Sequence, residues 1–366
     1  MSRKNFNISP KKQRILAAPL DWGLGHATRC IPIIKELLEE RCEVLIAAKG
    51  SIQTLLQREF PELIFLPLDG YKMHYNDKKT SFRLSVFLQL PKLIFSILNE
   101  HIWLKKIVKR HKINAVISDN RFGLYHSNIP SIYITHQLSI KTGNKFLDKI
   151  AQKIHYWFIN KYSACWVPDF KEVNTIAGDL SHPDKLPLNV QYLGCLSRFE
   201  KKFGIEKKYN LLIILSGPEP QRTIFEKIIL KQLQDYKGII LFIRGLPGTI
   251  LIETTNNNLE IINHLAAAEL NIAIEQADLV ISRSGYTTIM DLIKLQQKAI
   301  LVPTPGQTEQ EYLAQYLMQQ NIFYCDQQDS FSLNSLVSKA ENFSFAIPMF
   351  DMEQYKNVIR QFTKSL

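Results

Sequence analysis

The feature that most constrains the fold is an alternation of short apolar runs and helical patterns, which occurs twice along the chain. The first series of expected strands covers residues 15–20, 43–48, 63–67, 115–118, 131–135 and 164–167. The second series covers residues 211–215, 238–244, 259–262, 279–282 and 299–302. Continuous apolar strands joined by helices are typical of parallel sheets covered on both faces. We therefore predict an α/β protein with two Rossmann-like, doubly wound domains.

The boundary between these domains is expected where the alternation stops and restarts, near residues 197–209. A chain of 366 residues is long enough for two domains with separate cores. We expect an N-terminal domain over residues 1–200 and a C-terminal domain over residues 201–347. The amphipathic segment at residues 348–366 predicts a final helix.

Charge and composition limit the classes of partner. The net charge of +11 indicates an anionic partner such as nucleotide phosphates, acidic lipid headgroups or nucleic acid. Nucleic acid is disfavoured, because the basic residues are spread over the whole length without an RNP-type motif, zinc-finger spacing or repeat. Five separated cysteines without a CxxC motif indicate reduced thiols, and no run of about 18 apolar residues predicts a membrane span. We expect a cytoplasmic protein.

One segment, residues 77–112, combines aromatic and aliphatic side chains with many lysines and arginines at helical spacing. We expect Pro91 to separate two helices there. One interpretation is a pair of core helices with a solvated basic face. The other is an interfacial surface that meets an anionic membrane, with apolar residues between the lipids. In that case the protein is peripheral on the inner face of the membrane.

The first strand–helix junction reads "DWGLGH", with Gly23, Gly25 and His26. The glycines allow a tight turn, and the free amides at the following helix start favour an anion. The third glycine of a dinucleotide fingerprint is missing, which disfavours a nicotinamide cofactor, and we expect no cofactor. His26 has the pKa class of a general base near neutrality. The alternative is that His26 only hydrogen-bonds a phosphate or the loop backbone.

A second junction, "ISRSGYTTIMD", follows the strand at residues 279–282. A helix is expected to begin near Tyr286, so that its first amides can cradle a diphosphate. Asp291 lies about one and a half turns into this helix, where it can accept hydrogen bonds from a ribose diol. The candidates to hold a nucleotide diphosphate at this helix start are Arg283, Ser284, Gly285, Tyr286, Thr287 and Asp291. The next expected strand ends in "PTPGQ", and Gln307 and Gln310 stand where a further helix is expected to begin.

These stretches resemble the donor-binding half of GT-B glycosyltransferases. The similarity is greatest to the peptidoglycan lipid-intermediate N-acetylglucosaminyltransferase family (glycosyltransferase family 28-like), with its "RSG-x5-E" and "P-x6-QQ" patterns. Asp291 stands where that family has its ribose-binding Glu. Gln310 falls on the first Gln of the pair, and Glu311 replaces the second. "GLGHATR" resembles the family's "GTGGH" loop, with His26 on the histidine.

The resemblance implies a GT-B fold, with two domains facing a central cleft and the C-terminal helix packing back toward the first domain. The acceptor would bind the N-terminal domain and the nucleotide sugar the C-terminal one. "LSGPEPQRT" stands where the family has "GGSQG", so Ser216 and Gly217 would offer amides to a phosphate. Arg222 would supply charge there, or is an ordinary surface arginine. Leu265 falls where the family reads uracil, which indicates UDP, with thymidine or guanosine donors as alternatives.

On the acceptor side, Asp119 resembles the strand-end Asp that orients the catalytic His in plant-type GT-B enzymes. Its alternative role is a helix N-cap. Arg121 and Gly123 in the same loop are candidates to meet an acceptor phosphate. His136 and Gln137 fall where the family carries "HEQN" and are candidate acceptor contacts, or serve as caps in the loop. Gly23 and Gly25 would form the wall beside the acceptor.

The expected activity is inverting, metal-independent transfer of a hexose or N-acetylhexosamine from a nucleotide diphosphate to a hydroxyl. The acceptor would be a saccharide, and the family analogy suggests a lipid-linked one. No DxD motif follows a strand, which favours a route without metal. The alternatives are a nucleotide-sugar hydrolase or 2-epimerase of the same fold. A non-catalytic partner that binds sugar nucleotide or membrane is a third interpretation.

Overall fold

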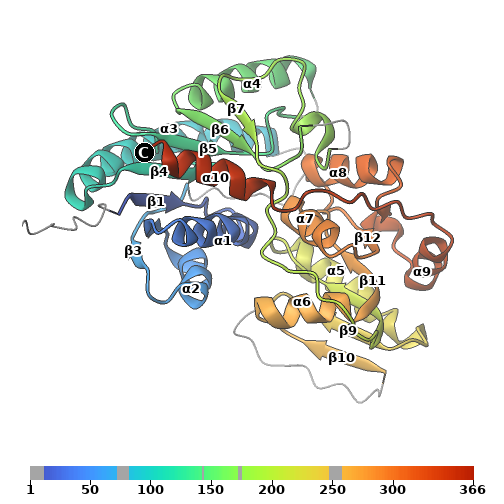
Figure 1. Ribbon diagram of the computed structural model, residues 1–366. Coiled ribbons are helices and arrows are strands. Elements are labelled where there is room, and N and C mark those ends of the chain that lie inside the picture. Colours follow the sequence, from blue (N-terminus) through green and yellow to red (C-terminus); the bar gives the residue numbers. More distant parts are fainter. Residues whose placement is uncertain (1–11, 72–81, 142–143, 172–174, 247–257) are drawn as a thin grey trace, which may run out of the picture.

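The chain forms two parallel β-sheets, one in each half, as the computed structural model shows (Figure 1). The structure describes residues 12–71, 82–141, 144–171, 175–246 and 258–366. The N-terminal sheet has the strand order β3 (Ile64–Leu66), β2 (Glu43–Ala47), β1 (Arg14–Ala18), β4 (Ala115–Asp119), β5 (Ser131–Ile134), β6 (Ala164–Val167) and β7 (Val190–Tyr192). The C-terminal sheet has the order β10 (Leu259–Ile262), β9 (Ile240–Ile243), β8 (Tyr209–Ile214), β11 (Ala277–Ser282), β12 (Ala299–Leu301) and β13 (Tyr324–Cys325).

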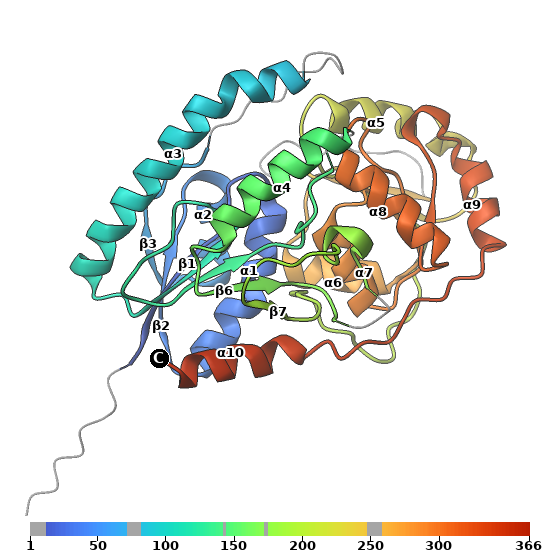
Figure 2. The same cartoon turned by 90° about the horizontal axis from the view of Figure 1, so that it is seen from above.

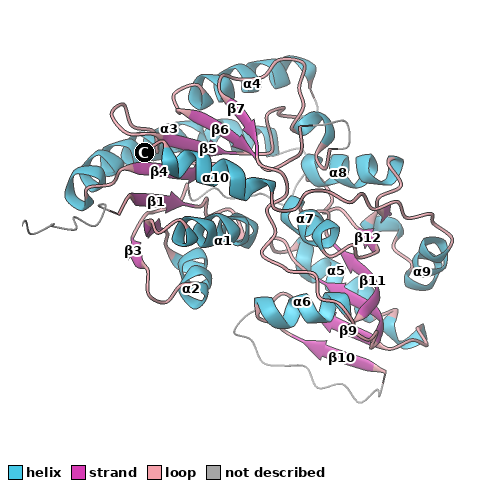
Figure 3. Ribbon diagram, in the orientation of Figure 1, coloured by secondary structure: helices cyan, strands magenta, loops and turns pink. Residues whose placement is uncertain are grey.

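Helices surround both sheets (Figure 3). Those that accompany the N-terminal sheet are α1 (Leu24–Glu39), α2 (Gly50–Glu59), α3 (Phe82–His111), α4 (Lys145–Ile159) and α10 (Gln354–Lys364). Those of the C-terminal domain are α5 (Gln221–Leu230), α6 (Ala267–Glu275), α7 (Tyr286–Lys294), α8 (Thr308–Gln319) and α9 (Leu333–Glu341). The prediction of two Rossmann-like domains is confirmed.

Alternate residues of each central strand enter different cores, which is why these strands are apolar throughout. In β1, Ile15 and Ala17 pack with α1, whereas Leu16 and Ala18 pack with Leu104 of α3. Side chains of a strand alternate between its two faces, so a strand covered on both sides needs an apolar residue at every position. Parallel strands also end at the same edge, and this places the loops after β1, β4, β5 and β11 where a site can form.

Two details of the sequence prediction are wrong. Pro91 does not separate two helices, because α3 continues through it from Phe82 to His111. A proline costs a helix one hydrogen bond and introduces a kink, and packing of the rest of a long helix can offset this cost. Strands β7 and β13 were not expected. They have three and two residues and lie at sheet edges, too short to give a recognisable apolar run.

The C-terminal helix packs back on the first domain, as the resemblance implied. Ile359 of α10 is fully buried, and Phe362 makes an edge-to-face contact with Trp166 of β6 at 5.3 Å between ring centroids. Arg360 Nε lies 2.9 Å from Glu36 Oε1 of α1. The chain therefore passes between the domains twice, once between β7 and β8 and once between α9 and α10.

Both crossing segments are attached to helix α7. At the end of α7, Lys294 Nζ lies 3.4 Å from Glu200 Oε2 of the first crossing and 3.0 Å from Glu353 Oε1 of the second. The first crossing is also buried against α7, where Leu196 N donates to Met290 Sδ at 3.4 Å. One apolar cluster continues from α1 through this segment into α7, so the two domains share part of their core.

Candidate active site

The N-termini of α1 and α7 meet at the interface between the domains. Helix α1 begins after Gly23, whose φ of 115° suits glycine, and α7 begins after Gly285. Thr287 Oγ1 donates to Gly25 O at 3.2 Å. A Cβ on Gly25 would lie 3.1 Å from Thr287 Oγ1, so the glycine permits this close approach. Two helix ends with unpaired amides and partial positive charge therefore lie side by side, an arrangement that suits an anion.

The predicted pair of His26 and Asp119 is brought together beside these helix ends. Asp119 is the last residue of β4 and is fully buried, and its Oδ2 lies 2.8 Å from His26 Nδ1. Arg29, one turn after His26 in α1, donates from Nε to the same Oδ2 at 3.0 Å and from Nη2 to Oδ1. The carboxylate is thus shared between an imidazole and a buried guanidinium.

This environment sets the charge of both groups. Burial lowers the pKa of His26 and the Arg29 charge lowers it further, and together they outweigh the opposing effect of Asp119. Burial acts to raise the pKa of Asp119, but Arg29 and His26 more than offset it and the net pKa is lowered. At neutral pH Asp119 is ionised and His26 is neutral. Because a carboxylate can only accept, the Asp119 contact favours the tautomer with the proton on Nδ1, whereas Arg29 Nη2 places a second donor 2.8 Å from the same nitrogen. A base role for His26 requires the first tautomer, in which Nε2 is free to accept a proton.

His136 and Gln137 follow β5 and connect this pair to the other domain. His136 Nε2 lies 2.7 Å from Glu309 Oε1 of α8, and Gln137 Nε2 donates to the other oxygen of Glu309. His136 also stacks on Tyr286 of α7 at 4.0 Å between ring centroids. Burial acts to raise the pKa of Glu309, but His136 and Arg29 lower it overall, so Glu309 is ionised. The interface is held by a hydrogen-bonded network around the Glu309 carboxylate.

Arg29 and Glu309 were not selected from the sequence, although each has a signal there. Arg29 is three residues after His26, so both lie on one face of the helix. Glu309 directly precedes Gln310, inside the stretch that resembles the family's "P-x6-QQ" pattern. Arg29 Nη1 lies 3.3 Å from His136 Nδ1, which completes a continuous path from Asp119 to Glu309.

The Arg283 side chain of the "RSG" motif points into its own domain. Its Nη1 donates to the carbonyl oxygens of Val302 and Pro303 at 3.2 and 3.1 Å, and its Nη2 donates to Gln328 Oε1 at 2.5 Å. Burial lowers its pKa to about 10. The guanidinium therefore supports the loop after β12. The neighbouring Ser284 Oγ donates to Gln310 O at 2.8 Å, which fixes this turn against α8.

Asp291 contacts the segment that links the domains. Its Oδ1 accepts a hydrogen bond from Ser197 Oγ at 2.5 Å. Burial raises its pKa to about 7, against the opposing effects of Ser197 and Arg198. Gln310 and Gln307 are bonded to each other at 2.6 Å, and Gln310 Oε1 accepts from Thr304 N at 2.9 Å. These two glutamines hold the loop between β12 and α8.

The loop after β8 contains Ser216 and Gly217, the latter with a φ of 105°. Thr304 Oγ1 lies 3.8 Å from a Cβ built on Gly217, is buried, and has no hydrogen-bond partner within the described residues. This hydroxyl is a candidate ligand contact that sequence reasoning missed. Arg222 is already paired with Glu226 Oε2 at 2.8 Å. Leu265, in the loop before α6, packs against the apolar core.

Arg121 and Gly123 are used to hold α3. Arg121 is buried and donates to Pro19 O at 2.8 Å and to Glu100 Oε1 at 2.6 Å. Gly123 N donates to Glu100 Oε2 at 3.1 Å, and a Cβ on this glycine would lie 2.3 Å from Ile97 O. Their polar groups are therefore engaged by α3 and by the end of β1.

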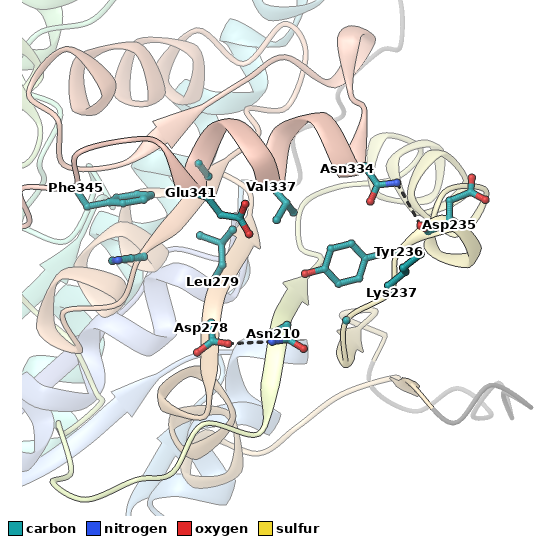
Figure 4. Close-up of a pocket in the computed structure, with 13 residues that line it drawn as sticks. Asn210, Asp235, Tyr236, Lys237, Asp278, Leu279, Asn334, Val337, Glu341 and Phe345 are labelled. Atoms are coloured by element: carbon teal, nitrogen blue, oxygen red, sulfur yellow. Dashed lines mark hydrogen bonds between the residues drawn. The ribbon is translucent and has the colours of Figure 1, made fainter.

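A separate cavity lies beside the C-terminal sheet, near the N-terminal ends of its strands β8 and β11 (Figure 4). Its volume is about 700 Å³, and Asn210 and Asp278 from the starts of β8 and β11 line it. The two side chains are bonded to each other at 3.2 Å. Since the domain interface lies at the ends of these strands, this cavity is distinct from the candidate site. Within the described ranges, no group of three His, Cys, Asp or Glu side chains is arranged to hold a metal ion.

Two Rossmann-like domains that meet at paired helix N-termini define the GT-B class of glycosyltransferases, and solved structures of that class share the fold. The kitacinnamycin glycotransferase aligns with a TM-score of 0.63 at 14% identity, over 97% of this chain and 96% of that one. MurG of Acinetobacter baumannii aligns with a TM-score of 0.54 at 13% identity, over 97% and 95%. These likenesses establish the architecture.

The sequence comparisons give the activity class. Residues 249–361 match the glycosyltransferase family 28 C-terminal domain. A UDP-N-acetylglucosamine–N-acetylmuramyl-(pentapeptide) pyrophosphoryl-undecaprenol N-acetylglucosamine transferase of Francisella philomiragia is 22% identical over 336 residues, which cover 86% of this chain and 84% of that one. The chain is a glycosyltransferase of GT-B fold that resembles the peptidoglycan N-acetylglucosaminyltransferase family.

Proposed function

We propose that this glycosyltransferase moves a hexose or N-acetylhexosamine from a UDP-sugar to the hydroxyl of a lipid-linked saccharide, with inversion and without a metal. The observation that carries the proposal is the position of the His26–Asp119 pair beside the N-termini of α1 and α7. His26, the proposed proton acceptor, lies in the first turn of α1, beside the two helix N-termini that are proposed to bind the diphosphate.

In the proposed reaction, the acceptor hydroxyl oxygen attacks the anomeric carbon while His26 Nε2 takes its proton. The bond between the anomeric carbon and the diphosphate oxygen breaks, and the diphosphate leaves with the electron pair. The amides at the start of α7 and the partial positive charge of that helix end stabilise the leaving group. A single displacement of this kind inverts the anomeric configuration.

The hydrogen bonds of His136 and Gln137 to Glu309 close the interface at this position. We infer that the domains separate to admit the donor and close again for transfer, as in other enzymes whose sites are completed by domain movement. The relative named above carries UDP-N-acetylglucosamine in its name, which supports a UDP-sugar as the donor.

A donor screen by thermal shift, with UDP-, dTDP- and GDP-sugars, tests the nucleotide. A ligand that binds only the folded state raises the melting temperature with occupancy, and we expect UDP-sugars to give the largest rise. Incubation of the preferred donor in EDTA, with and without a polyprenyl-diphosphate saccharide, then tests the reaction. We expect an inverted product by NMR only when acceptor is present. Rapid donor hydrolysis or epimerisation without acceptor would contradict transfer and favour the hydrolase or 2-epimerase.

An exposed apolar surface on helices α3 and α4 supports the proposal of a lipid-linked acceptor. The two helices run roughly parallel in Figure 2, and Ile97 of α3 and Phe158 of α4 belong to one apolar cluster together with Phe122 from the loop after β4. Both expose a row of large apolar side chains at helical spacing. The row comprises Ile94, Phe95, Leu98 and Ile102 of α3, and Phe146, Leu147, Ile150, Ile154 and Trp157 of α4. Phe95 and Phe146 are 65% and 70% exposed.

Exposed lysines flank these rows, among them Lys105 and Lys106 of α3 and Lys149 and Lys153 of α4. The opposite face of α3 contributes Ile97 and Leu104 to the core, as the first interpretation of this segment expects. No helix in the described parts of the chain has the length and apolar character needed to cross a bilayer. We propose that this surface binds peripherally to the cytoplasmic face of an anionic membrane.

Vesicle sedimentation tests this surface. We expect the protein to bind vesicles with anionic lipid more strongly than zwitterionic ones, and Phe95→Asp with Trp157→Asp to abolish the difference. Phe203→Asp is the matched control, since Phe203 is 95% exposed in the segment between the domains. Equal binding by the double variant and the wild type would contradict the proposal. Vesicle binding without turnover on any donor would instead favour the non-catalytic partner.

A further inference from the structure

The candidate base has a second neighbour besides Asp119, the buried Arg29. Its side chain is nearly inaccessible, with a residue exposure of 2%. It donates to both oxygens of Asp119, and its Nη2 also lies 2.8 Å from His26 Nδ1. Its Nη1 lies 3.3 Å from His136 Nδ1. The Arg29 guanidinium thus contacts His26, Asp119 and His136, all of the N-terminal domain.

The electrostatic effect of this contact opposes that of Asp119. A buried carboxylate beside an imidazole stabilises the imidazolium and draws a proton onto the ring. A guanidinium at 2.8 Å disfavours a second positive charge there, and it compensates the carboxylate at the same time. The imidazole then stays neutral. In the tautomer that the base role requires, Nδ1 donates to Asp119, and Arg29 Nη2 acts on the ring through its charge rather than through a hydrogen bond. The carboxylate orients the ring without charging it.

The other groups around His26 do not replace this cation. Asp119 comes from β4, His136 from the loop after β5 and Glu309 from α8, and the last two are bonded to each other. Among these groups only Arg29 carries a positive charge over the whole accessible pH range. Its planar fork also matches the two carboxylate oxygens, so it fixes the orientation of Asp119.

We propose that Arg29 is a positioning residue of the transfer reaction: it clamps Asp119 and keeps His26 uncharged, with Nε2 ready to take the acceptor proton. This inference rests on the proposed function, in which His26 is the base. It implies that the enzyme stays active at a lower pH than a histidine–carboxylate pair alone would allow.

NMR titration of isotope-labelled histidines tests the assignment without relying on turnover. The His26 resonance is identified by its loss in His26→Ala. In the wild type we expect a midpoint below the ordinary value of 6.5. In Arg29→Gln the midpoint should rise by about 1–2 pH units, because a nearby like charge is removed. Arg29→Lys should stay close to the wild type, and Lys35→Gln, on the exposed side of the same helix, should not move it. An unchanged midpoint in Arg29→Gln would overturn the proposal.

The pH profile of kcat/KM supplies the second readout. Its acidic limb should move with the NMR midpoint in Arg29→Gln, whereas a purely structural role would lower activity equally at every pH. If the midpoint moves but His26→Ala keeps full activity, the clamp on the imidazole stands and the proposed base role fails. Should Arg29→Gln not fold, Asp119→Asn is compared with the double variant Arg29→Gln/Asp119→Asn. A higher His26 midpoint in the double variant supports the proposal, and equal midpoints overturn it.

Discussion

The two domains bring different chemistry to their interface. The N-terminal domain contributes ionisable side chains, among them His26, Arg29 and Asp119, all within hydrogen-bonding distance of one another. The C-terminal domain contributes mainly a helix start and its backbone amides. Its two motif arginines are engaged elsewhere, Arg283 with carbonyl oxygens and Arg222 with Glu226. Two residues that stand out equally in their motifs can therefore have different roles. His26 lies beside Asp119 at the interface between the domains, whereas Arg283 holds a loop within its own domain.

The largest effect should come from the charged half. His26→Ala removes the proposed proton acceptor, and we expect turnover to fall by about 10²–10⁴-fold, the usual contribution of general-base catalysis. Donor affinity, measured by calorimetry, should change little, since the amides at α7 are untouched. His111→Ala is the control at a histidine outside the interface. If His26→Ala retains turnover, or loses only donor affinity, then the N-terminal domain does not supply the base and the comparison between the two domains is wrong.

Arg283→Met tests the scaffold role of the other half. The substitution leaves the oxygens of Val302, Pro303 and Gln328 without their buried donor, which should cost about 2–4 kcal/mol of unfolding free energy. Urea denaturation measures this loss. Donor affinity of the folded fraction should remain near that of the wild type. If stability is kept and nucleotide affinity is lost, then the guanidinium contacts the donor and the comparison is wrong.

Asp291 predicts a pH dependence of stability. Its pKa is raised from 3.8 to about 7 by burial, so between these values the folded state holds a proton that the unfolded state releases. The unfolding free energy contributed by this group should therefore be greatest below pH 3.8 and be lost as the pH rises toward 7. The slope from one such proton is at most about 1.4 kcal/mol per pH unit.

Denaturation of the wild type and of Asp291→Asn across this window isolates the contribution, and the variant should show the flatter profile. Donor binding provides the functional part of the same test. If the ionised carboxylate holds the ribose, donor affinity should increase through pH 7 in the wild type only. Parallel profiles in the two proteins would contradict the assignment of Asp291.

The smallest effect is expected at Gly285. Its φ of −70° is available to any residue, and the nearest side-chain atom to a new Cβ would be Thr288 Oγ1 at 3.9 Å. Gly285→Ala should change the unfolding free energy by no more than about 0.5 kcal/mol. Gly25→Ala is the matched comparison and should cost more, because its Cβ would meet Thr287. A destabilised Gly285→Ala protein would show that this turn is tighter than its geometry indicates.

The sequence predicted the architecture because each central strand is apolar at every position, as burial on both faces requires. It also identified His26 and Asp119, which the family resemblance paired, and the fold brings them to 2.8 Å because β1 and β4 are neighbours. The sequence could not predict the direction in which a side chain points. Arg283 turns inward because Gln328, 45 residues further along, accepts from it. Arg29 acquires its role when the N-terminal domain places Asp119 beside α1, and Glu309 acquires its role when the two domains meet.

Helix α7 has one end at the candidate site and the other at both segments that join the domains. Its first turn contacts Gly25, and its last residue, Lys294, binds Glu200 and Glu353. The two segments that join the domains both contact Lys294. We therefore expect the domains to rotate relative to each other about a hinge at these segments. Because α7 is a single helix of nine residues, we expect a displacement at its N-terminus to be transmitted to the segments that join the domains. If the donor binds there as proposed, its occupancy and the angle between the domains are linked through this helix.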